Sequence, residues 1–191
     1  MLVWQSLANP NTRFRIFRCA VYGLLVFNLY LLVRIDFNAE VLDQIGWLIL
    51  LGVFEWESTT LHRDYRPREK LVLGAAQAVG YVTVIVGWAG YWLTSLWPEF
   101  VNATLWLWVV VLLFADVHWP AHFQSPAWRV RNLLKLATYA GLVGCALYWA
   151  MHGELLDFYD AVLWIVCFAV VELNIFSFEQ KVEKGLRPSP T

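Results

Sequence analysis

Six long apolar segments constrain this chain more than any other feature of its sequence. Each approaches or exceeds the roughly 18 residues that mark a candidate transmembrane helix. Charged residues make up only 15% of the 191 residues, whereas an average soluble domain has about 25%. A water-soluble fold of this size could not bury all six segments, so we predict an all-α polytopic membrane protein with six transmembrane helices. The segments span roughly residues 16–33, 44–61, 71–96, 103–119, 133–151 and 160–178.

The basic residues predict how these helices are oriented. Lys and Arg near helix ends are retained on the cytoplasmic side of a membrane. Of the 14 basic residues, 13 flank the N-terminus, the second-to-third connector, the fourth-to-fifth connector or the C-terminal tail, and only Arg34 lies opposite. The opposite side is acidic, as at Glu40, Asp43 and Asp160. We therefore expect both termini in the cytoplasm and place the protein in a bacterial inner (plasma) membrane.

A recurring interval between aromatic and acidic residues predicts an internal repeat. In each even-numbered segment a Trp is followed eight residues later by an acid, and a Tyr lies 16 or 17 residues before each Trp. We expect a single membrane domain with pseudo-threefold symmetry, built from three parallel hairpins at about 13–62, 68–122 and 129–179, and a polar cytoplasmic tail at 180–191. The Trp–acid pairs are Trp47 and Glu55, Trp108 and Asp116, and Trp164 and Glu172.

The three repeated acids are the candidate functional residues. Glu55, Asp116 and Glu172 lie inside apolar sequence, where a charged side chain costs about 2.5–3.5 kcal/mol and faces the interior of a bundle. Three acids at one depth around one axis could bind a cation or exchange protons, because like charges held close together cannot all ionise. The leading hypothesis is therefore a cation or proton transporter or channel.

The same acids could instead be neutralised within their own hairpins. Arg18 lies at a depth that would let it meet Glu55, and Lys135 at a depth that would let it meet Glu172. Gln77 occupies the corresponding place in the middle hairpin, facing Asp116. Such structural ion pairs fit a second hypothesis, a non-catalytic membrane subunit or assembly factor of a larger complex. Its partners would be the lipid bilayer and homo- or hetero-oligomeric membrane proteins.

A third hypothesis is a membrane metalloenzyme with a site on the cytoplasmic side. Glu57, His62, His118 and His122 supply nitrogen and oxygen ligands suited to a divalent metal. The HxxxH pair requires a continuous helix, however, and Pro120 interrupts it. Haem is disfavoured because all four histidines lie at helix ends. The basic cytoplasmic face is the usual topogenic signal, and no nucleic-acid partner is expected.

Overall fold

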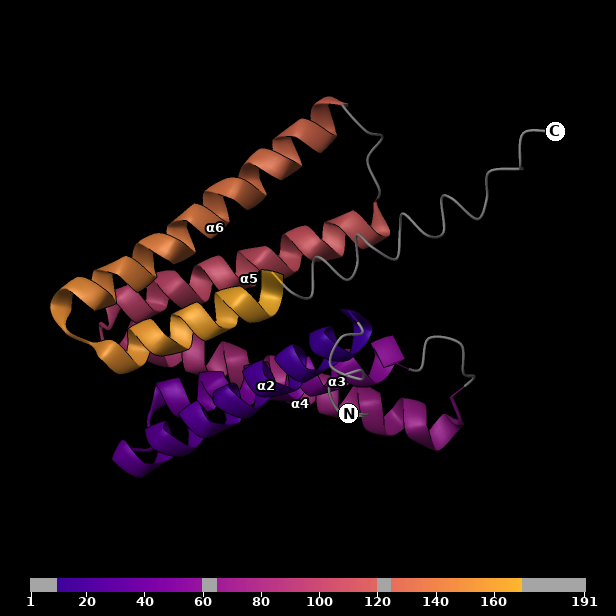
Figure 1. Cartoon of the computed structure of the whole chain (residues 1–191), viewed down its shortest axis with the longest axis horizontal. Helices are drawn as coiled ribbons and strands as arrows, with labels where there is room; N and C mark the ends of the chain where they lie inside the picture. The colour runs from indigo at the N-terminus through magenta and orange to yellow at the C-terminus, as the bar shows by residue number, and fades with distance from the viewer. Residues whose placement is uncertain (1–9, 60–64, 120–124, 170–191) are drawn as a thin grey trace, which may run out of the picture.

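The computed structural model describes residues 10–59, 65–119 and 125–169 and is all-helical in these ranges (Figure 1). Six helices follow one another with short connectors between them. They are α2 (Pro10–Ile35), α3 (Ala39–Thr59), α4 (Pro67–Leu93), α5 (Trp97–His118), α6 (Pro126–His152) and an unlabelled helix over residues 155–169.

Four of these six helices are long and apolar enough to cross a membrane. α3 is not among the four, and the last helix is described only to residue 169, which is too short for a span. The structure therefore confirms an all-helical protein with four candidate spans, and six spans remain a prediction. The four are Ile16–Ile35, Pro67–Leu93, Trp97–Asp116 and Pro126–His152.

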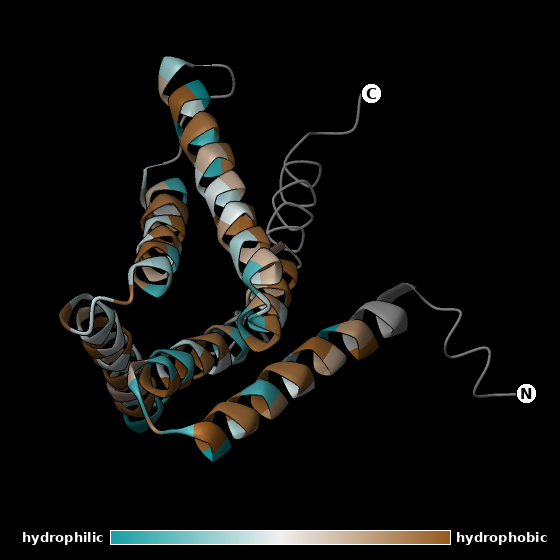
Figure 2. Ribbon diagram, turned by 90° about the vertical axis from the view of Figure 1, so that its left-hand side faces the viewer, coloured by the Kyte–Doolittle hydropathy of each residue, from teal (hydrophilic) through white to brown (hydrophobic). Residues whose placement is uncertain are grey.

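Most of the apolar surface of these helices faces outward. No more than 22% of the apolar window of any candidate span is buried inside the chain. Hydrophobic residues continue along most of the length of the helices in Figure 2. A monomeric soluble protein rarely exposes such a surface, whereas a bilayer covers it without cost. The helices are those of an integral membrane protein.

Local sequence explains where several helices begin and end. Pro67 and Pro126 occupy the first turn of α4 and α6, where a missing N–H costs nothing. Ser125 caps α6 by accepting a hydrogen bond from the Trp128 backbone N–H at 3.2 Å. Gly153 ends α6 with a φ of 80°, a left-handed conformation that favours glycine. The connectors after α2, α4 and α6 all lie at the left-hand end in Figure 1, so successive helices are antiparallel.

The closest helix packing joins α3 to α4, which belong to different predicted hairpins. Glycines on both helices bring the two backbones together. A Cβ atom on Gly46 would lie 2.8 Å from the Val84 backbone nitrogen and 2.9 Å from the Gly80 carbonyl oxygen. One on Gly87 would lie 3.0 Å from the Ala39 carbonyl oxygen. This glycine contact fixes α3 against α4 and so places the first turn of α3, which carries acidic side chains.

Three tryptophans occupy the centre of the bundle. The rings of Trp106 and Trp164 lie 6.4 and 6.3 Å from that of Trp47, and all three side chains are at most 6% exposed. Trp108, which the predicted repeat matched with Trp47 and Trp164, is 54% exposed. The residue that joins the central cluster from α5 is therefore Trp106.

Candidate functional site

Glu55 is held by an ion pair between α2 and α3. The Arg18 Nη2 atom lies 2.7 Å from Glu55 Oε1, and the Tyr22 hydroxyl donates a 3.1 Å hydrogen bond to Oε2. Both carboxylate oxygens thus have donors from the neighbouring helix. The guanidinium of Arg18 and the carboxylate of Glu55 therefore tie the two helices together.

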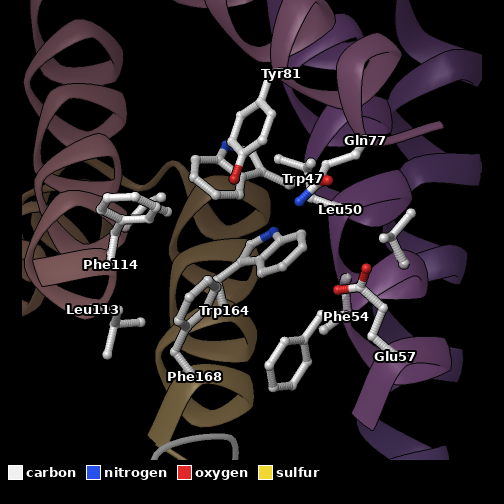
Figure 3. Close-up of a pocket in the computed structure, with 13 residues that line it drawn as sticks. Trp47, Leu50, Phe54, Glu57, Gln77, Tyr81, Leu113, Phe114, Trp164 and Phe168 are labelled. Atoms are coloured by element: carbon white, nitrogen blue, oxygen red, sulfur yellow. The ribbon is translucent and has the colours of Figure 1, made fainter. Parts of the chain in front are cut away.

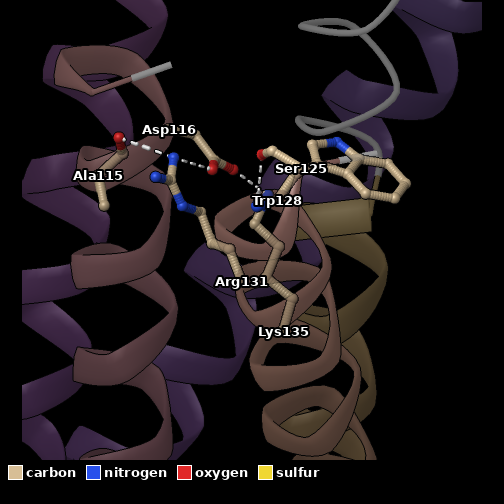
Figure 4. A network of polar contacts seen from close by, with 6 residues as sticks. All are labelled: Ala115, Asp116, Ser125, Trp128, Arg131 and Lys135. Atoms are coloured by element: carbon tan, nitrogen blue, oxygen red, sulfur yellow. Dashed lines mark hydrogen bonds and ion pairs between the residues drawn. The ribbon is translucent and has the colours of Figure 1, made fainter. Parts of the chain in front are cut away.

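Asp116 is held in the same way between α5 and α6 (Figure 4). Arg131 Nη1 donates to Asp116 Oδ1 at 2.8 Å and to the Ala115 carbonyl oxygen at 3.0 Å. Lys135 forms an ion pair with the second oxygen, Oδ2. Two cations therefore face one carboxylate, and each of its oxygens has a cationic partner. Asp116 as an ion-binding residue stays a prediction.

The structure describes only some of the other site residues that the sequence predicted. Glu172, His62 and His122 lie outside the described residues, and only the backbone of His118 is described. Lys135, proposed as the partner of Glu172, pairs with Asp116. Within the described ranges, no group of three or more His, Cys, Asp or Glu side chains is placed to hold a metal ion.

Gln77 and Glu57 both line an apolar pocket of about 370 Å³ (Figure 3). Aromatic and aliphatic side chains form most of its wall, including Trp47, Trp164 and Phe168. Its lining does not include Asp116, the residue that Gln77 was expected to face. This pocket offers little polar chemistry.

A different set of polar side chains meets near the opposite end of the helices from the ion pairs. The set, called here the polar cluster, lies close to the connectors after α2, α4 and α6. Its centre is the carboxylate of Asp160, whose Oδ1 accepts hydrogen bonds from Asn28 Nδ2 at 2.7 Å and Gln44 Nε2 at 3.0 Å. Trp164 Nε1 donates to Gln44 Oε1 at 2.9 Å. The members of the polar cluster are Asn28, Asp43, Gln44, Asn102 and Asp160.

The polar cluster borders a cavity of about 20 Å³. Asp43, Gln44, Asn102 and Asp160 line it together with three indole rings. The buried Oδ1 atoms of Asp43 and Asn102 have no hydrogen-bond partner among the described residues. Neither Asp43 nor Asp160 forms an ion pair with a Lys or Arg in the parts of the chain that the structure covers. The polar cluster therefore combines two unneutralised carboxyl groups with vacant acceptor atoms.

Glu40 and Asp157 form a carboxyl pair beside the polar cluster. Glu40 lies on the first turn of α3, before the apolar run that begins at residue 44. Burial raises the pKa of Glu40 to about 8, and the hydrogen bond and negative charge of Asp157 add to the rise. A carboxyl with such a pKa holds its proton up to about neutral pH and releases it just above.

This pair predicts a pH dependence of stability. Because the pKa of Glu40 is higher in the folded protein than its ordinary value of 4.5, stability falls as pH rises from about 4.5 to about 8. Replacing Glu40 with Gln removes that loss. We expect Glu40→Gln to melt about 4 °C higher than the wild type at pH 8.5 and at the same temperature at pH 4.5. A gain of roughly 1–2 kcal/mol in the free energy of unfolding would give that shift.

Thermal melts in detergent at the two pH values check this prediction. The exposed Asp36→Asn, at the same end of the bundle, controls for the general effect of removing an acid. A Glu40→Gln midpoint that differs from that of the wild type by the same amount at both pH values would refute the shared proton.

A repeated spacing in the sequence marks the residues of the polar cluster. Three segments carry an acid, then Asp or Asn three residues later, then Trp four residues after that, at intervals of 59 and 58 residues. This motif includes Trp106, whereas the predicted repeat includes Trp108, two residues later. The three copies of this acid–Asp/Asn–Trp motif are Glu40, Asp43 and Trp47; Glu99, Asn102 and Trp106; and Asp157, Asp160 and Trp164.

Comparisons with protein-family models, with curated proteins and with solved structures found no match for this chain.

Proposed function

We propose that this chain is a transporter or channel for protons or small cations, with the polar cluster as its ion-handling site. In this proposal six helices cross a bacterial inner membrane as three hairpin repeats, with both termini in the cytoplasm. The polar cluster then lies at the end of the bundle away from the cytoplasm, where the connectors are acidic.

The observation that carries the proposal is how Asp160 is held. Its carboxylate is bound by the amide groups of Asn28 and Gln44 and not by a base. A carboxylate paired with Arg keeps its charge, whereas one held by neutral donors can gain and lose a proton or a metal ion. Ionisable groups inside membrane helices commonly mark ion pathways. Glu55 and Asp116, by contrast, are neutralised in place.

The apolar pocket provides a second element of support. Trp47 and Trp164 line both the polar cavity and the apolar pocket of Figure 3, so two indole rings separate the two spaces. A route between them would require these rings to move. We propose that the rings act as the barrier between the polar cluster and the cytoplasmic half of the bundle.

Reconstitution tests the proposed function. Purified protein in proteoliposomes is expected to dissipate an imposed proton or Na⁺ gradient at least about ten times faster than protein-free liposomes, measured with an entrapped pH-sensitive dye and with ²²Na⁺. Equal rates, with the protein shown to be folded and inserted, would contradict it.

The ion pairs favour a second candidate function, that of a non-catalytic subunit. Arg18 with Glu55, and Arg131 and Lys135 with Asp116, tie neighbouring helices together without leaving a reactive group. Such a subunit would migrate with larger partners on native electrophoresis after gentle extraction, and it would show no flux when reconstituted alone.

A further inference from the structure

The cavity in the polar cluster has the size of one small ion. Its volume of about 20 Å³ exceeds the roughly 10–15 Å³ needed to hold one water molecule and leaves no room for a second. Trp47, Trp106 and Trp164 also line it. A space of this size admits an ion only after it has lost most of its hydration shell, so the protein must supply most of its ligands.

The donors around the cavity are all oxygens of carboxyl and amide groups. They come from Asp43, Gln44, Asn102 and Asp160, and no sulfur or imidazole takes part. Oxygen-only sites suit hard cations and not Zn²⁺ or Cu²⁺. Mg²⁺ usually keeps several waters, and Ca²⁺ takes 6–8 oxygens. Two of the oxygens here, Gln44 Oε1 and Asp160 Oδ1, already accept hydrogen bonds, and the remaining oxygens of the four side chains are fewer than Ca²⁺ takes. A dehydrated monovalent cation of small radius fits best.

Unpartnered acceptors are a second observation that indicates a ligand site. Asp43 Oδ1 and Asn102 Oδ1 are buried with no partner in the described parts of the chain, and both residues line the cavity. Asn28 is 0% exposed, and its Oδ1 is also unpartnered although its amide nitrogen is bound to Asp160. Buried acceptors are normally satisfied, because each one left unpaired costs about 1–3 kcal/mol. A cation in the cavity would satisfy Asp43 Oδ1 and Asn102 Oδ1, whose residues line it.

The acid–Asp/Asn–Trp motif supplies the oxygen-bearing side chains of the cavity. Each copy contributes one residue at its central position, namely Asp43, Asn102 and Asp160, and all three line the cavity. The middle copy has an amide where the others have a carboxyl, so three oxygen-bearing side chains bring two negative charges.

We infer that the cavity of the polar cluster binds one dehydrated Na⁺ ion, coordinated by Asp43, Asn102 and Asp160. This inference rests on the proposed function and names the ion that its site handles. In place of water, Na⁺ takes Asp43 Oδ1 and Asn102 Oδ1, which have no other partner among the described residues. The Asp160 carboxylate adds its charge while it keeps its hydrogen bonds to Asn28 and Gln44.

Binding to the full-length protein in detergent tests the inference without any need for flux. ²²Na⁺ is expected to bind saturably at one ion per chain, against a background of choline chloride. Na⁺ is also expected to raise the melting temperature more than K⁺ or choline at equal ionic strength. Asn102→Leu removes one oxygen without changing charge and should weaken binding at least about tenfold. Asp36→Asn, exposed at the same end, is the matched control and should bind as the wild type does.

Asn102→Asp is the second variant, and it protects the test against misfolding of the Leu variant. It keeps the size of the side chain and adds a third carboxyl to the cavity. We expect Asn102→Asp to gain affinity for Ca²⁺ over Na⁺, because the site charge rises from two carboxyls to three.

Three results would overturn the inference. They are no saturable Na⁺ binding by folded protein, Na⁺ binding that Asn102→Leu leaves unchanged, and displacement of Na⁺ from the wild type by micromolar Ca²⁺. Proton flux that depends on Asp160 in a protein that binds no Na⁺ would overturn this inference and leave the proposed function standing. Stoichiometric Na⁺ binding without any flux would support the Na⁺ site and contradict the proposed function.

Discussion

Asp160→Asn is expected to lower ion flux in proteoliposomes at least about 100-fold while leaving the protein folded. Loss of a group that exchanges protons in a transfer step commonly costs 10²–10⁴-fold in rate. Asn keeps an oxygen at the position that accepts from Asn28 and Gln44, so the local hydrogen bonds can persist. It cannot ionise, and it therefore offers neither a proton site nor a charge for a cation.

The control for this prediction is stability. Asp160→Asn should elute from size exclusion as the wild type does and should melt no lower, because a buried carboxyl without a basic partner is replaced by a neutral amide. Flux within threefold of the wild type, in a protein of normal stability, would show that Asp160 does not handle the ion.

Gly46→Val is expected to lower the melting temperature by about 10 °C. The new Cβ would meet the Val84 backbone nitrogen and the Gly80 carbonyl oxygen at 2.8 and 2.9 Å. Backbone atoms cannot turn aside as a side chain does, so α3 and α4 must separate. Overpacking of a close contact costs about 1–3 kcal/mol or more, and each kcal/mol is worth roughly 2–4 °C in a chain of this length.

Gly52→Val, on the same helix, is the matched control. A Cβ atom on Gly52 would meet nothing within 4 Å, so the same substitution there should change the melting temperature by less than about 3 °C. Thermal melts of both variants in one detergent make the comparison. Equal losses at the two positions would mean that the effect comes from helix propensity and not from the contact between α3 and α4.

Much of the fold could be predicted from the sequence because apolar length and charge act locally. The described helices overlap all six predicted segments, and each begins a few residues earlier, as α2 does at Pro10 and α6 at Pro126. The predicted end of the third segment at 96 was wrong, because α4 ends at Leu93. The polar residues in the first turn of a helix lie outside the apolar segment, so the apolar length of the sequence places the start of the helix too late. The partner of α3 could not be predicted, since its closest packing on α4 depends on where Gly46 meets Gly80 in space.

The candidate site was harder to predict than the fold. Glu55 and Asp116 were the predicted site residues because they lie inside apolar segments. The position of an acid in such a segment does not show its partners, and Asp116 faces two cations. Asp43 and Asp160 lie at the starts of helices, where acids are ordinary and cost little. What distinguishes them is convergence, because residues from three helices share one cavity. Only the motif that ends in Trp47, Trp106 and Trp164 carried that information.

Flux measured side by side in two acid-to-amide variants tests the central claim most directly. One preparation carries Asp160→Asn in the polar cluster. The other carries Arg18→Gln with Glu55→Gln, which removes both members of one ion pair. At matched insertion and fold, the account predicts flux near the protein-free level in the first and flux within a few-fold of the wild type in the second. The reverse result would place the ion site at Glu55 and contradict the account.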